Sequence, residues 1–437
     1  MRRGWASLGA CLALTCARPQ PPPLLLAEAA AAPRAPAAVS ASPAPPPVPS
    51  AAPGSLPAVT APAPGVSPGP LASFFDALRQ LSSGARTQHV RILWLGDSHT
   101  NADFLSGSVR SQLAERFGDG GPGFVRIGSQ PYRHDGLKIV RGGQWNIDPD
   151  PPARRSQQDD GVFGIGGTRA VPGPGATFRV QLAGRAPGVA EEPARFELSY
   201  TLPAGASYEL ELGGKRVRVD ASKSQDVATS GISHLTLTDK LGSVLTLRPH
   251  AGAPRFFGLI IEKTAELGVV VDTSGIDGAR LETPLAWNEA AFVAEAARRA
   301  PELFVVAYGT NEVFDRLKVE RYAGQLSELV RRVRGAAPQA SCLVLGPTDA
   351  PLGEGSVPRV AQVDAVLRAS ARENGCSFVS LQQLMGGEGS FARGMKAKER
   401  LAQLDRLHLT PKGYRELGQA LGKKLLDAYA SGHGDLP

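Results

Sequence analysis

The chain has 437 residues, 42% of them hydrophobic, which is enough to build a buried core in one or more globular domains. Its formal net charge of +7 falls to +4 over residues 71–437, because the first 70 residues carry four arginines and one acid. This mild charge, without lysine or arginine clusters, argues against a nucleic acid partner. No Cys or His cluster has metal-ligand spacing, so we expect no metal or cofactor.

The chain begins with the features of an export signal and a tether. Two arginines precede a modestly apolar stretch, and we assign residues 1–32 to a signal peptide or lipoprotein signal. Residues 33–70 are rich in Pro and Ala and have too few apolar side chains to fold, which predicts a disordered linker. We therefore expect an exported protein of the periplasm or cell envelope, with lipidation of Cys11 or Cys16 left open.

Strand and helix patterns alternate in two parts of the chain. Residues 89–96 predict a strand that leads into a helix near residues 101–118. The alternation returns with strands at 267–275, 302–309, 341–349 and 376–382 and helices at 287–300, 319–335, 359–375 and 411–430. Apolar strands separated by helices are typical of a parallel sheet covered on both faces. We predict a flavodoxin-like α/β domain made of residues 71–135 and 267–437.

The segment between these parts has a different pattern. Within residues 136–266, six short segments alternate apolar and polar side chains, and Gly213-Gly214 provides a hairpin turn. The glycine-rich stretches 118–124 and 161–170 are expected to be loops that lead into them. The segment therefore predicts inserted loops and a β-sandwich module that interrupts the α/β domain.

Two cysteines remain after the leader, Cys342 and Cys376, each on a predicted strand. Export permits a disulfide between them, but two small buried thiols fit the pattern equally well.

A polar cluster follows the first strand of the α/β domain. Ser98 comes after Gly96-Asp97, at the carboxyl end of a strand, where open parallel sheets bind their ligands. A serine at a strand-to-helix turn is well placed as a nucleophile, because the helix end favours developing negative charge. The alternative is that Asp97 and Ser98 are only turn and helix-cap residues.

Groups that could assist Ser98 as a nucleophile follow later strands and precede the last helix. Asp405 lies three residues before His408, a spacing that lets the carboxylate hold an imidazole that takes the serine proton. Asn311 follows the third strand and can donate to an oxyanion. Gly278, after the second strand, offers an unobstructed backbone N–H. The alternatives are a surface Asp with a capping His, a turn Asn and a turn Gly.

In chain order, these four groups resemble the sequence blocks of the SGNH (GDSL-type) hydrolases. The resemblance covers residues 88–117 and 267–430. One departure is visible: Glu312 follows Asn311 where the family usually has Asp. Because the role in the family belongs to Asn, we expect this departure to change little.

The resemblance implies a role for each residue. Ser98 is the nucleophile, His408 the general base and Asp405 the group that orients it. Gly278 and Asn311 join the Ser98 N–H in the oxyanion hole. For the glycine, three alternatives stay open: Gly275, Gly166 and Gly167.

A narrower resemblance suggests the substrate. The segment from Gly96 to Phe124, together with an inserted β-module, resembles the peptidoglycan O-acetylesterases, in which a carbohydrate-binding-like module interrupts the SGNH domain. This implies a monomeric serine esterase that removes O-acetyl groups from an extracytoplasmic glycan polymer, with peptidoglycan preferred. The open alternatives are an O-acyltransferase, a lipase-type esterase and a non-catalytic envelope glycan-binding protein.

Four further side chains have two interpretations each. His99 could contact the substrate or donate a hydrogen bond near the nucleophile. Tyr132, Trp145 and Trp287 could stack on sugars or belong to the core.

Overall fold

The computed structural model describes residues 69–129, 132–149, 160–183, 187–221 and 230–436. The predicted signal, both leader cysteines and all but the last two residues of the predicted linker lie outside these ranges. Within the described part, none of the helices combines the length and the apolar character needed to cross a bilayer.

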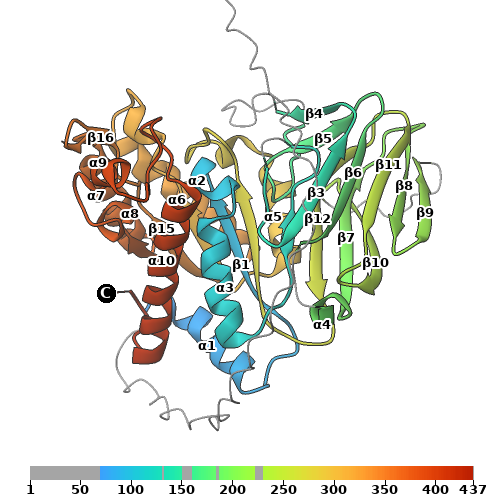
Figure 1. Ribbon diagram of the computed structural model, residues 1–437, viewed down its shortest axis with the longest axis horizontal. Helices are drawn as coiled ribbons and strands as arrows, with labels where there is room; N and C mark the ends of the chain where they lie inside the picture. The colour runs from blue at the N-terminus through green and yellow to red at the C-terminus, as the bar shows by residue number, and fades with distance from the viewer. Residues whose placement is uncertain (1–68, 130–131, 150–159, 184–186, 222–229, 437) are drawn as a thin grey trace, which may run out of the picture. The chain divides into compact units, whose positions relative to one another are not determined.

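A five-stranded sheet with parallel pairing forms the centre of the α/β part (Figure 1). Its strand order is β13-β1-β14-β15-β18. The strands are β1 (Val90–Gly96), β13 (Val269–Gly275), β14 (Leu303–Ala307), β15 (Ser341–Leu345) and β18 (Ser377–Val379). The predicted parallel sheet is confirmed, with β1 between the two strands that the sequence places second and third.

Helices cover both faces of this sheet. The first layer contains α1 (Ala72–Ser82), α3 (Leu105–Phe117) and α10 (Pro411–Ser431), and the second contains α5 (Glu289–Arg299), α6 (Glu320–Ala336) and α7 (Arg359–Glu373). Along β1, Ile92 and Trp94 pack into the first layer while Leu93 and Leu95 pack into the second. This alternation explains the continuous apolar run, because both faces of the strand are buried.

Short elements connect these layers. They are α2 (Ser98–Asn101), η2 (Pro284–Ala286), η3 (Glu312–Phe314), β16 (Pro351–Leu352), β17 (Gly355–Ser356), α8 (Leu381–Leu384) and α9 (Ser390–Lys396). The helix expected near residues 101–118 is α3, which begins at Leu105; it is preceded by the short α2, and Asp103 between them has a positive φ of 53°.

The inserted module is a β-sandwich, as predicted. One sheet contains β10 (Ser233–Lys240), β7 (Pro193–Thr201), β12 (Arg255–Lys263), β5 (Arg169–Pro172), β4 (Trp145–Asp148) and β2 (Gly123–Val125). The other contains β3 (Leu137–Gly142), β6 (Thr177–Leu182), β11 (Leu245–Ala251), β8 (Ser207–Leu212) and β9 (Lys215–Asp220), and the one-turn helix α4 (Pro187–Ala190) precedes β7. Apolar side chains of both sheets share one core. Gly213 and Gly214, both with positive φ, form the predicted turn between β8 and β9.

The sandwich has more strands than the six segments indicated. The additional ones are β2 to β5, which are short and flanked by glycine or proline. β2 lies inside a stretch expected to be a loop and before the expected boundary at residue 136, yet it pairs antiparallel with β12. Glycine at 121 and 123, both with positive φ, hides this strand from a pattern search.

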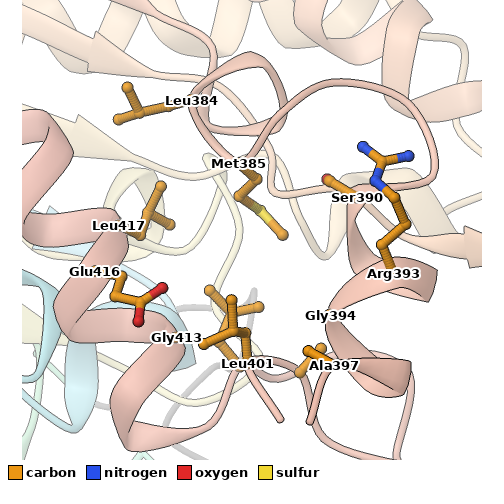
Figure 2. A pocket seen from close by; sticks show the side chains of 12 residues that line it. Leu384, Met385, Ser390, Arg393, Gly394, Ala397, Leu401, Gly413, Glu416 and Leu417 are labelled. Carbon is orange, nitrogen blue, oxygen red and sulfur yellow. The ribbon is translucent and has the colours of Figure 1, made fainter. Parts of the chain in front are cut away.

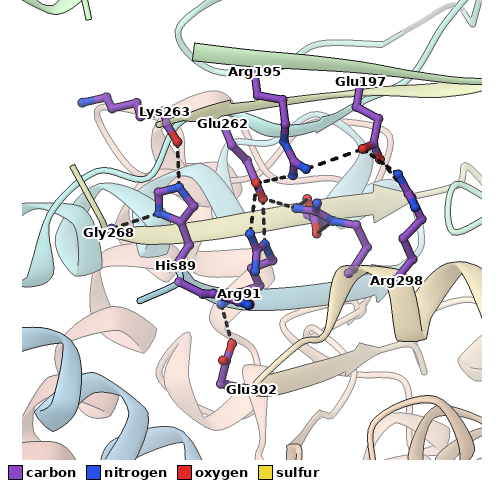
Figure 3. A network of polar contacts seen from close by, with 12 residues as sticks. His89, Arg91, Arg195, Glu197, Glu262, Lys263, Gly268, Arg298 and Glu302 are labelled. Carbon is purple, nitrogen blue, oxygen red and sulfur yellow. Dashed lines mark hydrogen bonds and ion pairs between the residues drawn. The ribbon is translucent and has the colours of Figure 1, made fainter. Parts of the chain in front are cut away.

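Buried charges join the module to the α/β part (Figure 3). Glu262 on β12 accepts hydrogen bonds from Arg91 on β1 at 2.8 and 3.0 Å and from Arg299 on α5 at 2.5 Å. Arg299 also pairs with Asp272 on β13 at 2.7 Å, and Arg195 on β7 reaches Glu262 at 2.7 Å. Burial opposes the charge on Glu262, but the arginines outweigh it and lower its pKa. The module is therefore ion-paired to the parallel sheet, through residues of β1 and β13 and of the covering helix α5.

Cys342 and Cys376 form a disulfide, which decides between the two interpretations of these residues. Cys342 lies in β15, as expected, whereas Cys376 lies one residue before β18. The bond links the two strands at one edge of the parallel sheet.

Candidate active site

The site forms where three neighbouring strands end. β1, β13 and β14 lie side by side, and their last residues Gly96, Gly275 and Ala307 are paired in register. After β1, the Asp97 side chain accepts the His99 N–H at 2.9 Å and caps α2, so that Ser98 becomes the first residue of that helix. The helix-cap interpretation of Asp97 is thus correct, and it leaves Ser98 partly exposed at the strand end.

His408 and Asp405 meet this serine from the other end of the chain. The Ser98 hydroxyl lies 2.9 Å from His408 Nε2, and His408 Nδ1 lies 2.7 Å from Asp405 Oδ2. Asp405 also accepts the backbone N–H of His408 at 3.0 Å, which folds the three-residue loop back on itself. Desolvation opposes ionisation of Asp405, but the hydrogen bonds from His408 prevail and lower its pKa. A hydroxyl, an imidazole and a carboxylate in this chain can activate a serine for attack.

Asn311 and Gly278 line the same pocket as Ser98. Asn311 precedes η3, and its amide Nδ2 donates to the Ala279 carbonyl at 2.9 Å. Gly278 has a φ of +75°, a conformation that favours glycine. The loop after β13 and the loop after β14 therefore meet beside Ser98.

The three alternative glycines do not line this pocket. A side chain at Gly275 would meet the backbone of Asn101 at 2.2 Å, so this glycine allows α2 to approach β13. Gly166 and Gly167 pack against Phe124 and Trp287.

The pocket has a volume of about 480 Å³. Its lining residues are Ser98, Asn101, Ala102, Phe104, Tyr132, Arg133, Asp277, Gly278, Asn311, Gln403, Leu407, His408, Leu409, Pro411 and Tyr414. One wall contains Phe104 and Arg133, and the Arg133 guanidinium lies 4.1 Å from the centre of the Phe104 ring. Arg415, outside the lining, lies 4.9 Å from the centre of the same ring.

Comparisons with known proteins show which family and which solved structures this chain resembles. The model of the GDSL-like Lipase/Acylhydrolase family matches residues 237–416, which contain Gly278, Asn311, Asp405 and His408 but not Ser98. A solved structure of a peptidoglycan O-acetylesterase is 25% identical, with a TM-score of 0.68, over 82% of this chain and 96% of that one. Together, these two matches support membership of the SGNH (GDSL-type) hydrolase family. This SGNH hydrolase is therefore an esterase that uses a serine.

Other solved structures are more distant from this SGNH hydrolase. A family two carbohydrate esterase from Clostridium thermocellum is 10% identical, with a TM-score of 0.28, over 66% of this chain and 98% of that one. An acetylxylan esterase from Geobacillus stearothermophilus is 19% identical, with a TM-score of 0.28, over 36% of this chain and 72% of that one. The search of curated proteins found no match.

His99 of this SGNH hydrolase lies behind the site rather than in the pocket. It is 5% exposed, and its Nδ1 lies 2.9 Å from the Tyr414 hydroxyl. Its ring lies against that of His408, with the ring centres 5.5 Å apart. Burial, followed by the charge of His408, lowers the pKa of His99 to about 3, so it stays neutral at physiological pH. The structure thus places His99 outside the lining of the Ser98 pocket, in contact with Tyr414 and beside His408.

Of the three aromatic residues considered for sugar stacking, Tyr132 alone lines the Ser98 pocket. Trp287 is 5% exposed and packs edge-on against Phe292, and Trp145 packs edge-on against Phe256. These two tryptophans therefore belong to packed clusters.

A second cavity of about 320 Å³ is lined by residues of α8, α9 and α10 and by Leu401, Ala402 and Leu409 (Figure 2). It contains a serine, Ser390, whose hydroxyl lies 3.4 Å from Asp349. The described residues that line it include no histidine. It therefore lacks the base that the Ser98 pocket contains.

Sequence reasoning missed several pocket residues of this hydrolase. Arg133 belongs to no motif, and Phe104 was given no role although it lies in the segment 96–124; the fold brings both beside Ser98. Asp277 and Leu407 are adjacent to Gly278 and His408, so proximity to a recognised block was the available signal.

Proposed function

We propose that the protein is an exported O-acetylesterase of peptidoglycan, with Ser98 as nucleophile. The proposed substrate rests on the similarity to a peptidoglycan O-acetylesterase, which covers 82% of this chain. That share is larger than the α/β part alone. The match thus extends into the β-sandwich. The predicted export signal and tether are consistent with action in the cell envelope.

In the proposed reaction, His408 Nε2 takes the Ser98 proton as the oxygen attacks the acetyl carbonyl. A bond forms between Ser98 Oγ and the carbonyl carbon, and the resulting oxyanion is bound by Asn311 and the N–H groups of Gly278 and Ser98. The bond to the sugar oxygen then breaks, and His408 returns the proton to that oxygen. Water, activated by His408, releases acetate and restores the serine.

The nucleophile is tested with p-nitrophenyl acetate. Replacement of Ser98 by Ala should lower kcat by at least about thousandfold. Ser390→Ala is a matched control, because this serine lines the other cavity and should leave kcat unchanged. Equal rates for Ser98→Ala and the natural protein would remove the proposed mechanism and would favour a glycan-binding protein.

The substrate is tested by acetate release from O-acetylated peptidoglycan beside acetylated xylan. We expect kcat/KM to be at least about tenfold higher on peptidoglycan, a difference of about 1.4 kcal/mol in transition-state binding. Similar slow rates on both polymers would contradict peptidoglycan as the preferred substrate, but would leave the proposed esterase mechanism untouched. Appearance of acetyl groups on an added glycan acceptor, rather than free acetate, would indicate a transferase.

A further inference from the structure

We propose that Glu312 is a positioning residue that sets the spacing between the Gly278 loop and the Asn311 loop, and with it the geometry of the oxyanion hole. The inference rests on the proposed function, in which these two loops bind the oxyanion. Glu312 does not line the pocket. It would therefore act through its neighbours rather than on the substrate.

One carboxylate joins the two loops. Glu312 Oε1 accepts the N–H of Leu281 at 2.8 Å, and Oε2 accepts the N–H of Gly309 at 3.0 Å. Leu281 lies three residues after Gly278, and Gly309 lies two residues before Asn311. A side chain that binds both backbones holds the two loops at a fixed separation. Its exposure of 0% means that water cannot replace either bond.

Other contacts of the two loops depend on the same spacing. The Asn311 amide donates to the Ala279 carbonyl at 2.9 Å. Arg280 Nη1 donates to the Gly278 carbonyl at 3.1 Å, and Arg280 Nε donates to Asp315 at 3.0 Å. A shift of either loop would therefore disturb the amide and the glycine together.

The backbone of Glu312 is itself held in place. Its carbonyl accepts Arg359 Nε at 3.0 Å and lies 3.4 Å from the Tyr322 hydroxyl. These partners come from α7 and α6, which pack on the sheet. With the backbone held, the extra methylene of glutamate, relative to the aspartate usual in the family, gives the carboxylate more reach.

The test is E312Q, assayed with p-nitrophenyl acetate at pH 8. Glutamine keeps the shape but presents an NH₂ group to one of the two N–H donors, so one hydrogen bond is lost. We expect kcat to fall about tenfold to hundredfold with KM changed less than about twofold, since the hole acts in the transition state. A purely structural role would lower the thermal stability without this selective loss of kcat.

A double variant identifies the route of the effect. Asn311→Ala alone should lower kcat by about 10² to 10³. If Glu312 acts through this hole, E312Q added to Asn311→Ala should cost less than about a further twofold, because the two effects are coupled. A fully multiplicative loss would overturn the proposal.

Glu295 provides the matched control. It is also a buried acid, 7% exposed, and it accepts from Ser230 at 2.8 Å and lies 2.9 Å from His234 Nε2. E295Q should lower the unfolding temperature but leave kcat unchanged. An equal loss of kcat in E295Q and E312Q would contradict a specific role.

E312D is a second variant, which keeps the charge and shortens the reach, and its kcat should also fall. Unchanged kcat in E312Q, or failure of both E312Q and E312D to fold, would overturn the proposal. Failure of the proposed function would show separately, as full activity of Ser98→Ala or as a different polymer preference, since this test uses a small ester.

Discussion

Ser98 Oγ and His408 Nε2 lie 2.9 Å apart, although 310 residues separate them in the chain. Ser98 is followed by α3 and His408 by α10, and these two helices pack side by side (Figure 1). At their contact, Gly418 approaches the backbone of Leu105 so closely that a side chain there would meet its carbonyl oxygen at 2.4 Å. The approach of two helices therefore sets the distance between nucleophile and base.

Gly418→Ala should separate α3 from α10 and weaken both folding and turnover. Alanine in a helix is normally favourable by about 0.5–1 kcal/mol over glycine, but the clash should outweigh this, with a net loss of about 1–3 kcal/mol. Gly324→Ala in α6 is the control, because nothing lies within 4 Å of the added carbon. Urea unfolding should show opposite signs for the two variants. Stabilisation by Gly418→Ala would contradict the close approach.

Asp405→Asn should leave the fold intact and lower kcat. The amide can present its NH₂ group to His408 Nδ1, which places the imidazole proton on Nε2 and leaves no acceptor for the serine proton. We expect a fall of about 10² to 10⁴ in kcat with p-nitrophenyl acetate. Asp427→Asn, on the exposed part of α10 beside Lys423, should have no effect. Full activity of Asp405→Asn would show that the carboxylate is not needed to orient the base.

Glu262→Gln should destabilise the junction between the module and the sheet. Removing the acid leaves the buried guanidinium of Arg299 and the partly buried guanidinium of Arg91 without their shared partner, which typically costs about 3–5 kcal/mol. Since the pKa of Glu262 is lowered, the contribution is present above its unfolded value of 4.5 and is lost as the pH falls further. Lys396→Gln, which breaks an exposed pair, should cost less than about 1 kcal/mol by chemical unfolding at pH 7. A loss of unfolding free energy in Glu262→Gln as small as that in Lys396→Gln would contradict a structural role for the network.

Sequence reasoning predicted most of the sheet because its signals are local. In β1 the run from Ile92 to Leu95 is continuous, since each residue faces a covered layer. Asp405 and His408 are three residues apart, so their contact depends on one short loop. To predict the contact between Ser98 and His408, the fold class was needed as well. A parallel sheet was enough for this, because its strand ends meet at one edge.

The parts that could not be predicted depend on partners distant in the chain. Arg91 and Glu262 are 171 residues apart, and neither belongs to a periodic pattern that would reveal the pair. The significance of Glu312 was also missed. It was visible as a departure from the family pattern, but its two backbone donors at 281 and 309 belong to different loops and have no sequence signature.

Glu312 should also make stability depend on pH. Burial raises its pKa from 4.5 to about 7, so the folded protein binds this proton more tightly than the unfolded chain. The resulting stabilisation is complete below about pH 4.5 and is lost as the pH rises through about 7, a total of about 3 kcal/mol. The difference in unfolding free energy between pH 5 and pH 8 should be smaller by this amount in E312Q. Other titrating groups, present in both proteins, cancel in the comparison. An identical pH dependence would show that Glu312 is ionised throughout.

The Cys342–Cys376 bond should stabilise the edge of the parallel sheet that does not carry the nucleophile. Its sequence separation of 34 residues closes a loop around α7, and the loss of unfolded-chain entropy corresponds to about 4 kcal/mol. Replacing both cysteines with Ala should therefore lower the urea midpoint strongly. It should leave kcat unchanged below the transition, because Ser98, Gly278 and Asn311 follow β1, β13 and β14 and not the two strands that the bond links. The natural protein in reductant should unfold like the variant, whereas a midpoint insensitive to reductant would mean that the thiols are not joined.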